Sequence, residues 1–140
     1  MNFEILPLIG IGELKFGMDR GQVRRYLGER YRSFKRSPQS MSPCDYFEHL
    51  GVFCYYDSSD ELEAVELALP ACPSIDNRQL LGLGIATATR TLGSLSQNIQ
   101  EEADGTTARD IGVSVHAPLA KENTAAPVES VLVFRSGYYD

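Results

Sequence analysis

The sequence predicts an α+β fold, in which two repeated helix–β-hairpin units form an antiparallel sheet with helices on one face. Residues 50–67 and 111–133 share a hairpin pattern, in which Leu-Gly-Val-Phe-Cys-Tyr-Tyr is matched by Ile-Gly-Val-Ser-Val-His-Ala. A stretch with helical spacing precedes each hairpin and passes through Leu-Gly, at Leu27-Gly28 and at Leu92-Gly93. Chance similarity between two ordinary hairpins is the alternative explanation.

Length and composition favour one domain. The chain has 140 residues, of which 43% are hydrophobic and 23% charged, so it can bury a core without a metal or disulfides. Pro70 and Pro73 break the chain between the two hairpins. We therefore expect a single domain, 1–140, with pseudo-repeat halves at residues 9–70 and 71–137.

The first half begins with short strands and a capped helix. Residues 3–16 mix apolar side chains with Pro and Gly, which is typical of short strands joined by a tight turn. Asp19 can cap a helix, and Gln22 can reach back to it in a capping box. Gly28 either ends this helix or lies within it.

The second half contains two competing helix signals. Residues 76–79 repeat the Asp-x-x-Gln pattern, but matching them to the first capping box disagrees with the Leu-Gly pairs by roughly two helical turns. We expect a longer second helix that accommodates both. Residues 101–110 are polar and predict a turn, before strands at 111–117 and 128–135.

Strand alternation divides the hairpin residues between two faces. A mostly aliphatic set should form the helix-covered core: Val52, Cys54, Tyr56, Val65, Leu67, Leu69, Val113, Val115, Val131 and Val133. The opposite, open face would carry Phe53, Tyr55, Ala64, Glu66, Ser114, His116, Ser130 and Leu132. Two alternatives stay open: the N-terminal segment or a loop covers Phe53 and Tyr55, or a one-residue slip exchanges the faces.

The charge is acidic and unevenly distributed. A formal net charge of -6 disfavours nucleic acid as a partner and favours a basic protein. Basic residues concentrate between 20 and 36, whereas residues 45–66 contain seven acidic side chains and no Lys or Arg. These segments are either solvated surfaces or include an acidic docking patch that attracts a basic partner.

Cysteine usage and the N-terminus predict a cytoplasmic protein. Three cysteines without a CxxC pair suit a reducing compartment. Met1 to Glu4 lack the basic and apolar regions of a secretory signal. The weakly polar run 80–93 is too short to span a bilayer, so we expect no membrane association.

Motifs for catalysis, metals and cofactors were not found in the sequence. His49 and His116 are its two histidines, and no serine lies in a Gly-x-Ser-x-Gly elbow. Cys44 lies near His49 without a feature that would activate its thiol. The Cys and His spacings match no zinc pattern, and the Gly-x-Gly pairs lack the rest of a nucleotide fingerprint. We therefore expect neither an enzyme nor a bound cofactor or metal.

One segment resembles known bacterial domains. Residues 16–28, Phe-Gly-Met-Asp-Arg-Gly-Gln-Val-Arg-Arg-Tyr-Leu-Gly, resemble the Gly-Met-(Thr/Ser)-x-x-x-Val-x-x-x-Leu-Gly opening of the outer-membrane assembly lipoproteins. The β-lactamase inhibitor protein family repeats a related helix-plus-sheet unit twice. The second resemblance implies a concave sheet that clamps a folded protein, although none of that family's contact residues can be transferred. A small, acidic chain without catalytic motifs is also similar to immunity proteins of bacterial toxin systems.

Our first hypothesis is a non-catalytic protein-binding or inhibitor module, specifically an immunity protein that neutralises a cognate, basic bacterial toxin domain. The expected partner-binding residues are Phe53, Tyr55, Asp57, Asp60, Glu61, Glu66, Ser114 and His116. The alternative is a small-molecule sensor or carrier, with a pocket between sheet and helices lined by Tyr26, Tyr46 and Tyr56. An enzyme of unknown type is the third possibility.

Overall fold

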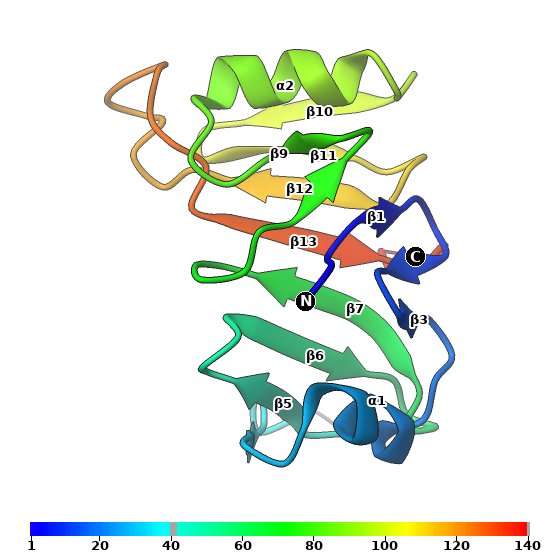
Figure 1. The fold of residues 1–140 in the computed structure, drawn as a ribbon. Helices are drawn as coiled ribbons and strands as arrows, with labels where there is room; N and C mark the ends of the chain where they lie inside the picture. Colours follow the sequence, from blue (N-terminus) through cyan, green and yellow to red (C-terminus); the bar gives the residue numbers. More distant parts are fainter. Residues whose placement is uncertain (40–41, 140) are drawn as a thin grey trace.

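The protein contains a large antiparallel sheet and two helices in the computed structural model, which describes residues 1–39 and 42–139 (Figure 1). In order across the sheet, its eight strands are β10 (Ile99–Glu102), β11 (Gly105–Ala108), β12 (Val113–His116), β13 (Ser130–Phe134), β7 (Leu62–Leu67), β6 (Val52–Tyr56), β5 (Cys44–Phe47) and β4 (Arg32–Phe34). Four strands consecutive in the chain, β4–β7, form one half of the sheet and four others, β10–β13, form the second half, with β7 and β13 paired at the centre. The mixed α and β content agrees with the predicted fold class.

Both helices cover the same face of this sheet. Helix α1 (Arg20–Leu27) buries Val23 and Leu27, and α2 (Ile85–Gly93) buries Ala88 and Leu92. These four side chains share one apolar cluster with the aliphatic residues of β6, β7, β12 and β13 that were predicted to face the helices. An exception is Leu69, which lies beyond the end of β7 and is exposed.

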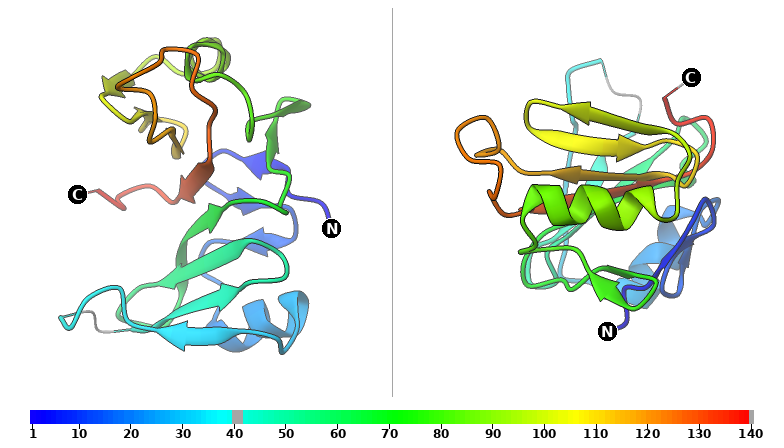
Figure 2. Two further views of the ribbon diagram at one scale, coloured as in Figure 1. Left: turned by 90° about the vertical axis from the view of Figure 1, so that its left-hand side faces the viewer. Right: turned by 90° about the horizontal axis from the view of Figure 1, so that it is seen from above.

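Two small sheets cover the remainder of the helix face. One contains β1 (Ile5–Leu6), β2 (Gly10–Ile11) and β3 (Leu14–Lys15), and the other β8 (Ser74–Ile75) and β9 (Arg78–Gln79). Ile11, Leu14 and Ile75 belong to the same core cluster as the helices. Figure 2 shows that β1–β3 and the C-terminal segment lie on opposite sides of the large sheet.

The first helix follows its predicted capping signal. Asp19 accepts from the backbone N–H of Gln22, whose side chain accepts in turn from the N–H of Asp19. Gly28 ends the helix with a φ of 102°, a conformation that glycine adopts without a steric penalty. The helical spacing that continues to Phe34 therefore does not belong to α1, and Phe34 lies in β4 instead.

Two expectations for the second half are wrong. Asp76 and Asn77 both have positive φ and form the two-residue turn between β8 and β9, so the Asp-x-x-Gln pattern does not begin a helix. Helix α2 is a nine-residue helix that begins after Gly84, not the longer helix expected. Residues 101–110 contain most of β10 and β11 rather than a turn alone, because polar side chains are tolerated on an exposed edge.

The turns before β6 and β12 have the same hydrogen bonds. In the first, the N–H groups of Leu50 and Gly51 donate to the carbonyls of Phe47 and Glu48, and the Gly51 carbonyl accepts from Ala68. In the second, Ile111 and Gly112 donate to Ala108 and Arg109, and Gly112 accepts from Phe134. Gly51 has a φ of 71° and Gly112 a φ of 69°. A Cβ at these positions would lie 2.1 Å from the Ala68 carbonyl oxygen and 2.3 Å from that of Phe134.

These contacts make both turn glycines sensitive to substitution. Gly51→Ala and Gly112→Ala should each lower the free energy of unfolding by at least about 2 kcal/mol, because a side chain adds backbone strain and a clash with the paired strand. Urea denaturation measures the change. Gly93→Ala is the matched control, since Gly93 has open space around it and lies in the last turn of α2. Losses of less than about 0.5 kcal/mol at Gly51 and Gly112 would contradict this account of the turns.

Candidate functional site

A row of eight side chains crosses the face of the sheet opposite the helices. Cross-strand pairing places its members side by side: Gln100, Thr107, Ser114, Leu132, Glu66, Phe53, Tyr46 and Arg32. Each is partly or largely exposed, whereas the flanking residues in the central strands point into the helix-side core. We call this set the cross-sheet row. It brings together three of the predicted site residues: Phe53, Glu66 and Ser114.

One end of the cross-sheet row is aromatic and cationic. The rings of Tyr46 and Phe53 stack with centroids 4.0 Å apart, and Phe34 meets Phe53 edge-on at 6.2 Å. The Arg32 guanidinium lies 5.8 Å from the centre of the Tyr46 ring and pairs with Glu48. Aromatic rings held on a rigid strand provide contact area at a low cost in conformational entropy.

The other end of the row is polar. The hydroxyls of Thr107 and Ser114 lie 2.9 Å apart, and the predicted site residue His116 is exposed 3.3 Å from a carboxylate oxygen of Asp104. These side chains line a hollow of about 310 Å³, together with Gln100 and Glu102. The two ends of the open face therefore differ in chemistry.

The centre of the open face is covered, so the expected exposure of Tyr55 is wrong. Tyr55 is 7% exposed, Ala64 is 0% and Phe134 is 3%. The Arg36 guanidinium lies 3.9 Å from the centre of the Tyr55 ring, and the Tyr55 hydroxyl donates to Glu66 at 2.6 Å. Burial and the bond to Glu66 raise the pKa of Tyr55. Phe53, by contrast, stays partly exposed as the prediction required.

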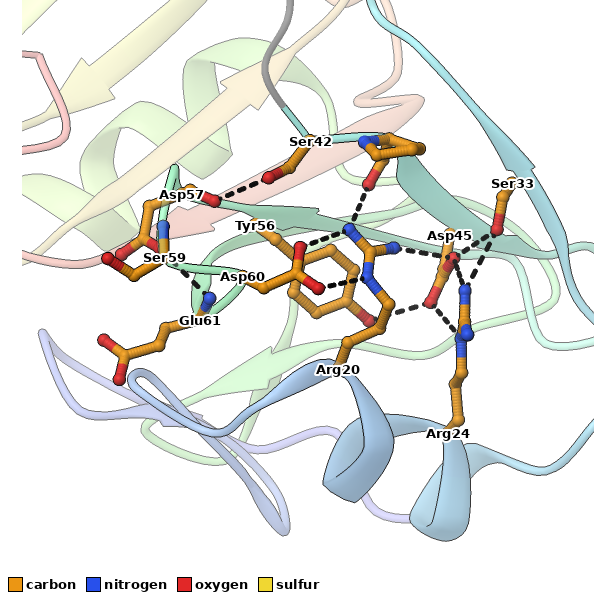
Figure 3. Close-up of polar contacts among 11 residues, drawn as sticks. Arg20, Arg24, Ser33, Ser42, Asp45, Tyr56, Asp57, Ser59, Asp60 and Glu61 are labelled. Carbon is orange, nitrogen blue, oxygen red and sulfur yellow. Dashed lines mark hydrogen bonds and ion pairs between the residues drawn. The ribbon is translucent and has the colours of Figure 1, made fainter.

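Five of the seven acidic side chains between residues 45 and 66 form ion pairs within the molecule, a pairing that neither interpretation of the charge had considered. Asp60 binds both Nε and Nη2 of Arg20, and Asp57 lies 2.8 Å from Arg135. Glu61, the third predicted site residue in the β6–β7 turn, is exposed (Figure 3). Three residues of the basic segment, Arg20, Arg24 and Arg32, pair with three of the acidic segment, Asp45, Asp60 and Glu48. Part of the segregated charge is therefore neutralised within the molecule, and the remainder, including Glu61, lies at the surface.

A buried carboxylate is the centre of this pairing. Asp45 is 0% exposed and accepts from Arg20, Arg24, Ser33 and Tyr56 at 2.7–3.1 Å (Figure 3). Burial alone would raise the pKa of Asp45, but the bonds from Arg24, Ser33 and Tyr56 outweigh it and hold this pKa below its usual value. Asp45 therefore stays charged under the helix and ties α1 to β5.

Burial determines the acidity of two of the three cysteine thiols. Burial raises the pKa values of Cys44 and Cys54, which disfavours the thiolate that a nucleophile requires. Among the described residues, His, Cys, Asp and Glu form no cluster of three or more that could hold a metal ion. In the same part of the chain, neither helix is long and apolar enough to cross a membrane.

The three tyrosines of the alternative small-molecule pocket lie apart. Each tyrosine lines a different hollow. Tyr26 lines a hollow near the N-terminus, and Tyr46 lines a second hollow together with Arg30 and His49. Tyr56 lines a third hollow together with Arg36. The Tyr56 hydroxyl is already used by Asp45. These residues do not come together around one cavity.

Four residues of the open face were not predicted from the sequence. Arg36 and Tyr138 are 102 positions apart and form a 2.7 Å hydrogen bond. Arg32 and Thr107 lie in β4 and β11, and neither strand was among those that the sequence predicts. Arg32 and Arg36 were noted only as part of a basic stretch.

Comparison with protein-family models, curated proteins and solved structures found no match for this chain. The geometry of the open face is therefore the observation from which a function can be inferred.

The Asp45 network should dominate the stability of the first half. Asp45→Asn should lower the free energy of unfolding by about 3 kcal/mol, because the amide cannot accept from all four partners and leaves guanidinium groups unpaired. Chemical denaturation at pH 7 measures this loss. Glu29→Gln, which changes an exposed carboxylate after α1, should stay within about 0.5 kcal/mol of the wild type.

The same substitution should flatten the acid limb of the stability curve. The folded pKa of Asp45 is lowered, so its contribution is present above the unfolded pKa of about 3.9 and is lost as pH falls through the folded pKa. Below pH 4 the wild type should therefore lose stability more steeply than Asp45→Asn. Parallel curves for the two proteins between pH 5 and pH 2 would show that Asp45 is not responsible.

Proposed function

We propose that this protein is a non-catalytic binding module that holds a partner protein on the open face of its large sheet. The observation that carries the proposal is the cross-sheet row, where eight partly exposed side chains form a continuous line across all eight strands. Stacked aromatic residues at a rigid surface are the side chains that most often dominate the energy of protein interfaces. Tyr46 and Phe53 are therefore the proposed anchors.

A basic, folded protein is the partner that fits the charge. The chain has a formal net charge of -6, and Glu66, Glu102 and Asp104 lie on or beside the open face. Complementary charge increases the rate of encounter and selects against acidic partners. Neutralisation of a cognate bacterial toxin, as by an immunity protein, is the specific form of this proposal.

We also infer that the two halves of the chain arose as repeats of one unit. The support is the mirrored order of helix and four strands around the β7–β13 pair. The equal hydrogen bonding of the Gly51 and Gly112 turns adds a second correspondence, at the positions where the sequence pattern repeats. Such a doubled unit gives a sheet wide enough to contact a folded protein.

Substitution of the aromatic anchors tests the binding proposal. The double variant Tyr46→Ala/Phe53→Ala should weaken partner binding by about 2 kcal/mol or more, roughly 30-fold in Kd, because it removes the stacked rings from the open face. The wild-type protein is first used to capture its partner from an extract of cells that encode it. Titration calorimetry with the purified partner then gives the Kd of each variant.

The control is Leu95→Ala, which removes an exposed apolar side chain directly after α2. This variant should bind like the wild type, and thermal unfolding should show that all three proteins are folded. Equal Kd values for the double variant and the control, or no captured protein at all, would refute the proposed function.

A further inference from the structure

The cover over the centre of the open face has an unusual composition. Pairing across β13, β7 and β6 places Ala64 between Phe134 and Tyr55. A methyl group between two rings leaves a notch, and the notch is bridged by one side chain from the loop after β4 and one from the segment after β13. Arg36 lies over Tyr55, Tyr138 stacks on Phe134 with ring centroids 5.6 Å apart, and the two are joined by a 2.7 Å bond from Arg36 Nη1 to the Tyr138 hydroxyl.

Side-chain contacts at the surface hold this cover in place. Tyr138 belongs to residues 136–139, which we call the strap. The strap backbone is tied by a 3.3 Å bond from the Tyr138 N–H to the Arg135 carbonyl, within a single turn. Arg109 lies 5.1 Å from the centre of the Tyr139 ring, which itself is 45% exposed. Segments with few buried contacts and exposed attachments are those that open at low free energy.

Displacement of the strap would expose the apolar residues at the centre of the open face. Tyr55, Ala64 and Phe134 are buried beside the partly exposed Phe53 and Leu132, which pack against the same apolar cluster. Tyr139 also meets Phe134 edge-on with ring centroids 5.0 Å apart, so both strap tyrosines cover this ring. Displacing the strap with both tyrosines would join the buried and partly exposed residues into one apolar centre, with the Arg36 guanidinium at its margin. Tyr138 itself shows which chemistry fits: a ring that stacks on Phe134 and a hydroxyl that accepts from Arg36.

We propose that the notch between Phe134 and Tyr55 is a docking site for a tyrosine side chain of the partner protein, and that Tyr138 occupies it until the partner displaces the strap. This inference rests on the proposed function, since it specifies how the open face receives its partner. On binding, the phenol ring of a partner tyrosine would replace the ring of Tyr138. Its hydroxyl would accept the same hydrogen bond from Arg36, and the apolar centre would gain contacts with the partner. The tethered ring competes at a high effective concentration and weakens the apparent affinity.

A capped tripeptide, acetyl-Gly-Tyr-Tyr-amide, is the probe for this site. Titrations followed by NMR of the Ala64 and Leu132 methyl groups should give a Kd at least tenfold lower for Tyr138→Ala than for the wild type, because the internal competitor is gone. Tyr26→Ala, a substitution on the helix-covered face, is the matched control and should behave like the wild type. Adding Arg36→Met to Tyr138→Ala should remove the gain.

A second variant keeps the test valid if Tyr138→Ala perturbs folding. Gly137 has a φ of 85°, so Gly137→Val disfavours the turned-back strap without altering the tyrosine ring. It should also bind the tripeptide more tightly than the wild type. Equal Kd values for wild type and both strap variants would overturn the inference. So would equal binding of acetyl-Gly-Leu-Leu-amide, because the notch would then be an apolar hollow without preference for tyrosine.

The purified partner separates failure of this inference from failure of the proposed function. Tyr138→Ala should bind the partner several-fold more tightly, whereas Tyr46→Ala/Phe53→Ala should bind it more weakly. If the Tyr46/Phe53 variant loses affinity and Tyr138→Ala binds the partner like the wild type, the strap does not compete with the partner. That result would refute this inference and support the proposed function. Tighter tripeptide binding by Tyr138→Ala, with an unchanged partner Kd in the Tyr46/Phe53 variant, would keep the tyrosine site and refute the proposed function.

Discussion

The buried carboxylate of Asp45 is the constraint on which the arrangement of the first half depends. A charge without solvent contact is tolerated only when donors surround it, and Arg20 and Arg24 of α1 are the cationic donors that reach it. Both arginines lie on one side of the helix, so their bonds determine where α1 sits on β5. These bonds hold Arg20 and Arg24, and with them α1, against the core side of the sheet. Within the described ranges, 1–39 and 42–139, the opposite side of the sheet carries no helix.

The join between the two halves has a different physical basis. The β7–β13 pair connects them through backbone hydrogen bonds, and each half contributes aliphatic side chains to the common core beneath. Gly51 and Gly112 let the chain at the start of β6 and β12 approach the ends of β7 and β13 closely, since a Cβ would collide with the paired carbonyl. The result is one continuous sheet, in which side chains from residues 32 and 100 belong to the same row. A surface of this width requires both halves.

Local patterns predicted the fold where short-range physics determines it. The capping box at Asp19 and the alternation of Val52, Cys54 and Tyr56 lie within a few residues, and both are confirmed. The second Asp-x-x-Gln failed because Asp76 and Asn77 tolerate positive φ and form a turn. The pairing of opposite charges was not predicted either, since the sequence does not show that Arg20 lies beside Asp60. The Arg36–Tyr138 bond could not be predicted, because it joins two irregular segments through tertiary structure alone.

The burial of Tyr55 resolves a conflict inherent in a wide open sheet face. A face with Tyr55, Phe134 and Phe53 exposed together would favour non-specific association, the usual consequence of a large apolar surface patch. A cover made of backbone strands would prevent this but would also close the face permanently. Arg36 and Tyr138 instead cover the centre with two side chains, one from the loop after β4 and one from the strap, joined by a single hydrogen bond. The apolar centre is thus shielded by side chains rather than by a further layer of backbone, as the proposed displacement of the strap requires.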